Sequence, residues 1–129
     1  MGSWKKIGFP ADAKDILTVG ALTHEGLNSP FSSVGPTADG RVKPDVMAIG
    51  SSTSVVSGSG SIQHDNGTSF SCPTLAGMVA CLWQALPNKT AKQIIDIVRQ
   101  AGNNVAHPDN IYGYGTPDFW KAYQSGLNN

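Results

Sequence analysis

The sequence lacks a long hydrophobic run, an excess of charge of either sign, and a cysteine framework. No apolar stretch approaches the roughly 20 residues of a membrane-spanning helix, and the N-terminus lacks the charged-then-apolar pattern of a signal peptide. Nine basic residues balance nine acidic ones, and the basic residues are scattered, with only Lys5 and Lys6 adjacent. We therefore expect no nucleic-acid partner, no membrane anchor and no phosphate-binding surface.

The only two cysteines are Cys72 and Cys81, nine residues apart in a segment expected to form one helix. At about 1.5 Å of rise per residue they would lie about 13 Å apart, too far for a disulfide bond. No Cys or His partners stand near them at zinc-site spacing, so we expect both to be small core residues.

Two short apolar runs rich in β-forming residues, 16–22 and 45–50, predict strands that are buried on both faces, as in a parallel sheet. A loop rich in Gly, Pro and Ser, 29–44, joins them. The serine-rich stretch 51–66 carries interspersed apolar residues, which indicate a surface hairpin and not a disordered linker.

Three helices are expected in the second half of the chain. Residues 73–86 are apolar on nearly every face, which predicts a helix buried all round with Pro73 in its first turn. Thr90 and Gln93 form a capping box for an amphipathic helix that ends near Gly102. The last helix, about 117–123, is expected to be anchored by Phe119, Trp120 and Tyr123.

Ser69 stands between the small-residue loop and the apolar helix, at or near a helix N-terminus. Unpaired N–H groups and the positive end of the helix dipole would stabilise an oxyanion there. Gly67 would permit a tight turn and the approach of a substrate. The same position suits an ordinary N-cap serine, and the local sequence alone favours the cap. The segment is not the Gly-x-Ser-x-Gly elbow of α/β-hydrolases, because Ser71 replaces the second glycine.

Several motifs, in order along the chain, resemble the subtilase family of serine proteases. Residues 66–73, Asn-Gly-Thr-Ser-Phe-Ser-Cys-Pro, resemble its serine signature, and residues 31–48 match a second long motif. Residues 16–21 look like the strand before that motif, and residues 112–115 like the C-terminal Gly-x-Gly turn. The resemblance runs from about Trp4 to Tyr123.

The resemblance implies an α/β fold: the C-terminal portion of a doubly wound parallel-sheet subtilisin-like domain, with a buried helix after the nucleophile serine. We expect residues 1–3, Met-Gly-Ser, to have been added ahead of the natural chain. Residues 4–124 would form the C-terminal part of the catalytic domain, and residues 125–129 a tail.

The resemblance also assigns roles. Ser69 would attack the scissile peptide carbonyl while its own N–H helps to bind the oxyanion, with Thr68 as a secondary donor. Gly8, Phe9 and Pro10 resemble the segment that lines the first specificity pocket, where the proline bond is cis, so we predict a cis Phe9–Pro10 bond. Gly67 would lie beside the substrate.

Asp45 falls near a weak cation site of some relatives; a capping or strand-edge carboxylate is the favoured alternative. The chemistry itself requires no cofactor, and calcium in the full-length domain would be structural.

The sequence contains neither the aspartate and histidine motifs of the subtilase triad nor the oxyanion asparagine, all of which precede the serine in the family. None of the chain's histidines, His24, His64 and His107, matches a family position, and we expect each to be a solvated loop residue. Because a serine without its base is a weak nucleophile, we expect the isolated chain to be inactive. Its uncovered apolar helix and sheet edge predict self-association.

Two functions remain open from the sequence. One is a fragment of a serine endopeptidase that acts on peptide or protein substrates, and the other is a non-catalytic pseudoprotease or a binding and assembly module. The intact Gly-Thr-Ser-x-Ser-x-Pro signature favours the first. Most members of the family are secreted or exported, so the resemblance implies the same here. The sequence does not identify the preferred substrate, because the resemblance implies that most of the specificity pocket is built from strands that this sequence does not contain.

Overall fold

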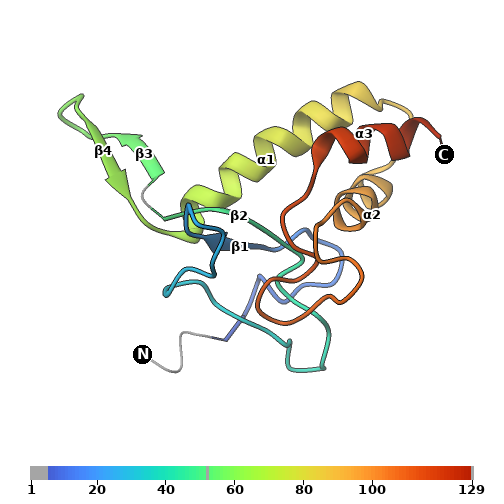
Figure 1. Cartoon of the computed structure of the whole chain (residues 1–129), viewed down its shortest axis with the longest axis horizontal. Coiled ribbons are helices and arrows are strands. Elements are labelled where there is room, and N and C mark those ends of the chain that lie inside the picture. Colours follow the sequence, from blue (N-terminus) through green and yellow to red (C-terminus); the bar gives the residue numbers. More distant parts are fainter. Residues whose placement is uncertain (1–5, 52, 129) are drawn as a thin grey trace.

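The computed structural model describes residues 6–51 and 53–128, and the prediction that residues 1–3 were added lies outside them. The strands are β1 (Val19–Leu22), β2 (Val46–Ile49), β3 (Thr53–Val56) and β4 (Ile62–Asp65). The helices are α1 (Thr68–Ala85), α2 (Ala91–Gln100) and α3 (Phe119–Leu127) (Figure 1).

The first two strands form a parallel pair, as the two buried apolar runs predicted. Val19 is opposite Val46, and the register continues to Leu22 opposite Ile49. The next two strands form an antiparallel hairpin in which Val56 is opposite Ile62. This hairpin projects away from the body of the molecule in Figure 1, which confirms the predicted surface excursion.

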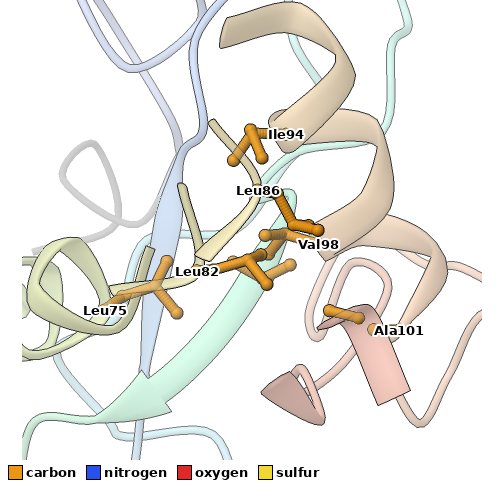
Figure 2. Close-up of a cluster of buried hydrophobic side chains, with 8 residues drawn as sticks. Leu75, Leu82, Leu86, Ile94, Val98 and Ala101 are labelled. Atoms are coloured by element: carbon orange, nitrogen blue, oxygen red, sulfur yellow. The ribbon is translucent and has the colours of Figure 1, made fainter. Parts of the chain in front are cut away.

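The core lies where α1 crosses the parallel strands and meets the other two helices (Figures 1 and 2). Leu82 follows Leu75 by seven residues, and Leu86, the C-cap of α1, follows Leu82 by four. At helical spacing the three side chains therefore lie on the same side of α1. Figure 2 shows Leu82 and Leu86 beside Val98 and Ile94 of α2, with Leu75 farther from α2. Val46, Ala101 and Ala122 complete this buried cluster.

The structure corrects the predicted serine-bearing helix in two respects. It begins at Thr68 and not at Pro73, which therefore lies inside α1. It is also buried on one side only, because the parallel strands and the two other helices cover one face. Met78 and Trp83, on the remaining surface, are 46% and 42% exposed. The prediction that this helix is buried on every face is therefore wrong for the described residues.

Cys72 and Cys81 are both free thiols, as predicted, but both are exposed. The expectation that they are core residues is wrong for this chain. They lie off the stripe of Leu75 and Leu82 through which α1 packs into the core.

The capping box of α2 is confirmed. The Thr90 side chain accepts a hydrogen bond from the Gln93 N–H, and the Gln93 side chain accepts one from the Thr90 N–H. Ile94 and Val98 form the buried stripe that the amphipathic pattern predicted.

The last helix runs on to Leu127, past the predicted end and into the segment expected to be a tail. Phe119 and Tyr123 pack against the buried core, as predicted, whereas Trp120 is 67% exposed and its predicted role as an anchor is wrong. Small residues of α3 add to this contact: Ala122 and Gly126 are buried, and a Cβ on Gly126 would clash with a methyl carbon of Leu86. Within the described residues, no helix has both the length and the apolar character needed to cross a bilayer.

Candidate active site

Ser69 is the second residue of α1, and its side chain is exposed. The N-cap residue is Gly67, so the alternative that Ser69 itself caps the helix is wrong. In the described part of the chain, the Ser69 hydroxyl has no hydrogen-bond partner. The buried Ser71 differs, because its hydroxyl donates to the Thr68 carbonyl at 3.0 Å. Ser69 is thus the serine of this turn whose hydroxyl is uncommitted.

The end of β2 holds the serine-bearing turn in place. The Gly67 N–H donates to the Gly50 carbonyl at 2.9 Å, and the Gly50 N–H donates to the Leu22 carbonyl at 3.0 Å. A Cβ on Gly50 would stand 2.8 Å from both the Ala21 Cβ and the Gly67 oxygen. The sheet and the helix start therefore approach each other so closely that only glycine fits between them.

The first turn of α1 presents the electrostatics that an oxyanion requires. The N–H groups of a helix's first residues have no intrahelical acceptor, and they carry the positive end of the helix dipole. An anionic oxygen beside Ser69 would meet donors that the helix itself does not use.

Two cavities flank this turn and bring together residues far apart in the sequence. The first, about 460 Å³, is lined by Thr68 and Ser69 on one side and by Pro10 and residues 16–19 on the other. The second, about 400 Å³, is lined by Thr68, Gly8 and Phe9.

The predicted specificity segment and the candidate nucleophile thus surround adjoining space, and the predicted cis Phe9–Pro10 bond is present. Gly67 lines neither cavity and contacts the end of the sheet instead.

No histidine of the chain lines either cavity. His24 and His107 are exposed and lie outside the strands and helices, as predicted. His64 was expected on a loop but belongs to β4, where its Nδ1 lies 3.5 Å from the Ser54 hydroxyl oxygen. The described residues therefore do not bring an imidazole to Ser69.

Asp45 caps the Thr18 N–H just before β1, as the favoured alternative predicted, and it is also the centre of a buried ion-pair cluster. Its carboxylate accepts from the Thr18 N–H at 2.7 Å, from Lys43 Nζ at 2.7 Å and from Arg99 Nε at 2.9 Å. The side chains of Asp45 and Lys43 are each 3% exposed. Sequence reasoning missed this cluster because Arg99 comes from α2, 54 residues away.

The cation beside Asp45 is a lysine ammonium. Lys43 Nζ also bonds the Ile16 carbonyl at 3.1 Å and the Thr18 hydroxyl at 3.2 Å, so three oxygens surround it. Nowhere in residues 6–51 and 53–128 do three or more His, Cys, Asp or Glu side chains gather as a metal site would require.

A parallel strand pair covered by helices, with an exposed serine at a helix N-terminus beside a cavity, defines the class of α/β proteins in which a ligand can reach the serine at the end of the sheet. The family model described as the subtilase family matches residues 2–115, and this chain belongs to that family.

Relatives of known name agree with this membership. The chain is 32% identical over 114 residues to subtilisin DY of Bacillus licheniformis, covering 88% of this chain and 38% of that protein. It is 31% identical over 128 residues to the subtilisin-like protease SBT6.1 of Arabidopsis thaliana, covering 89% of this chain and 12% of that protein. This chain therefore spans well under half the length of these relatives.

Solved structures show the same fold. The CspB protease of Clostridium perfringens superposes with a TM-score of 0.80 at 22% identity, over 95% of this chain and 29% of that one. At that identity the similarity supports the fold alone, a portion of the subtilisin-like α/β domain.

Proposed function

We propose that this chain carries the nucleophile of a subtilisin-like serine endopeptidase, and that Ser69 is that nucleophile. The observation that carries the proposal is the exposed, uncommitted Ser69 hydroxyl at the start of α1, beside a cavity of about 460 Å³. The buried neighbour Ser71 has its hydroxyl bonded to a backbone carbonyl and has no path to a substrate.

In the proposed reaction, Ser69 Oγ bonds to the carbonyl carbon of the scissile peptide while its proton passes to an imidazole base. The negative charge that develops on the carbonyl oxygen is stabilised by N–H groups of the helix start, including that of Ser69, with Thr68 as a secondary donor. The imidazolium then returns the proton to the leaving amine, and water hydrolyses the acyl ester.

The proposal requires that the base come from outside these residues. Subtilases order their triad as Asp, His and Ser, and none of the three histidines here lines the cavity beside Ser69. We propose that the aspartate, the histidine and an oxyanion asparagine belong to a part of the catalytic domain beyond the present sequence. The isolated chain is then inactive, and the reaction needs no cofactor.

The substrate in this proposal is an extended peptide. The cavity lined by Gly8, Phe9 and Thr68 lies next to the one lined by Pro10 and Ser69, so a side chain held against residues 8–10 would place its own carbonyl near the Ser69 hydroxyl. Gly67, beside the serine, would leave room for the substrate backbone.

Peptidase activity of a longer protein from the same gene tests the proposal. Cleavage of a casein substrate that is lost in Ser69→Ala and retained in Ser71→Ala supports it. If Asp and His motifs are encoded upstream and the folded protein still cleaves nothing, the alternative of a binding or assembly module is favoured.

Two further parts of the proposal concern the surroundings of this chain. The exposed outer face of α1, which includes Met78 and Trp83, would drive self-association of the isolated chain. The whole protein would be secreted or exported, as the family resemblance implies. Cell fractionation with an antibody to this chain would test export: recovery of the protein only inside intact cells contradicts it.

A further inference from the structure

A third cavity, of about 330 Å³, lies on another part of the molecule and is lined mainly by basic side chains. Its wall combines residues 14–15, residues 41–43 with Asp45, two residues of α2 and Tyr114. The charged members are five basic residues and two aspartates: Lys14, Asp15, Arg41, Lys43, Asp45, Lys92 and Arg99. The nine basic residues of this electroneutral chain look scattered along the sequence, yet the fold gathers five of them here.

The floor of this cavity carries more positive than negative charge. One buried carboxylate, that of Asp45, bonds both Lys43 Nζ and the Arg99 guanidinium, with nitrogen–oxygen distances of 2.7 and 2.9 Å. A second partner of Arg99 is Asp96, at 3.3 Å, but its side chain is 57% exposed. An exposed carboxylate is screened by water and salt far more than a buried one, so Asp96 offsets little of the excess positive charge of the cavity floor.

The mouth of the cavity adds cations that have no ion-pair partner in the described part of the chain. Lys14 and Lys92 are exposed and take part in none of the salt bridges. Arg41 is paired with Asp39, whose side chain is 64% exposed. Asp15 is the one acidic residue of the rim that opposes these charges.

We propose that this cavity binds a small, multiply charged oxyanion of the size of inorganic phosphate, held between Lys14, Lys92 and Arg99. A volume of about 330 Å³ is at the lower end of the range for small-molecule sites. Charge-assisted hydrogen bonds from ammonium and guanidinium groups are the contacts that such an anion prefers. The site is too small for a nucleic-acid strand, and it does not depend on Ser69.

Such an anion would join the segment around Lys14 to α2, which supplies Lys92 and Arg99. Because a ligand that binds only the folded state stabilises it in proportion to its occupancy, phosphate should also raise the thermal stability of the chain.

Equilibrium dialysis of the 129-residue chain against radiolabelled phosphate tests this directly. We expect saturable binding at one site, competed by sulfate but not by acetate or chloride at matched ionic strength. The double substitution Lys14→Gln/Lys92→Gln removes two exposed cations and their charge-assisted hydrogen bonds, and it should weaken binding by at least about tenfold, which corresponds to about 1.4 kcal/mol.

The matched control is Lys121→Gln, an exposed lysine of α3 that does not line the cavity; it should bind phosphate as the parent does. The proposal is overturned if binding does not saturate, if acetate or chloride competes equally, or if the double substitution binds phosphate as tightly as Lys121→Gln.

Discussion

The backbone N–H of Gly67 donates a hydrogen bond of 2.9 Å to the carbonyl oxygen of Gly50. This bond joins the end of β2 to the N-cap of α1, two residues before Ser69. The position of the serine is therefore set by the parallel strand pair and not by the helix alone.

Substitution of Gly50 by alanine should destabilise the chain and displace the serine turn. The added Cβ would lie 2.8 Å from both the Ala21 Cβ and the Gly67 oxygen, and such overpacking typically costs about 1–3 kcal/mol. Urea unfolding measures the change in the free energy of unfolding. Gly58→Ala is the control, because nothing lies within 4 Å of its Cβ position. Equal stability of the two variants would show that the contact at Gly50 is not tight.

Loss of the Asp45 carboxylate should cost more stability than loss of the Lys43 ammonium. Asp45→Asn leaves a lysine that is 3% exposed without its counter-ion, and breaking a buried pair in this way costs about 3–5 kcal/mol. Lys43→Met leaves Asp45 with Arg99 and the Thr18 N–H. Thermal unfolding of both variants shows which substitution lowers the stability more. A larger loss in Lys43→Met would contradict the central place given to Asp45.

The pKa of Asp39 should lie at about 2, below its ordinary value of 3.8. The causes are hydrogen bonds from Arg41, the larger one, and from Thr37. Because the folded-state pKa is lowered, the stabilising contribution is present above pH 3.8 and is lost as the pH falls towards 2.

Carboxyl-carbon NMR titration measures this pKa, and Arg41→Gln should raise it towards 3.8. The side chain is exposed, so added salt should weaken the shift. An Asp39 pKa that Arg41→Gln leaves unchanged would contradict the assigned cause.

The isolated chain should self-associate through the outer face of α1, and Met78→Glu should weaken that association. Met78 is 46% exposed on this face, and a carboxylate there would have to be desolvated in the interface. Sedimentation velocity over a range of concentrations follows the monomer fraction. Trp120→Glu, at a 67% exposed site on α3, is the control. If the parent chain is monomeric, or if Trp120→Glu weakens the association as much as Met78→Glu does, the outer face of α1 is not the interface.

Local signals predicted much of the fold. The two apolar runs gave the parallel pair, and the Thr90–Gln93 capping box gave the start of α2, because each depends on residues close together in the sequence. The predicted start of α1 was wrong because proline rules place Pro73 in a first turn, whereas the structure begins the helix at Thr68, where Gly50 at the end of β2 holds the preceding Gly67. The predicted burial of Cys72 and Cys81 was wrong because an apolar helix sequence does not show which of its faces other elements cover.

Long-range features of the sites could not be predicted from the sequence. The Asp45 cluster depends on Arg99, and the basic cavity joins Lys14 to Lys92 across more than half of the chain. Ser69 was found from the motif around it, since its local sequence alone favoured a cap. The structure removed that alternative by placing Gly67 at the cap position.

The most direct test of the account is the site of fluorophosphonate labelling in a longer protein from the same gene, mapped by mass spectrometry. We expect one adduct, on Ser69, which disappears in Ser69→Ala and persists in Ser71→Ala. The 129-residue chain alone should react slower by several orders of magnitude, because it lacks the base. Labelling of a different serine in the longer protein, or equally fast labelling of the isolated chain, would contradict it.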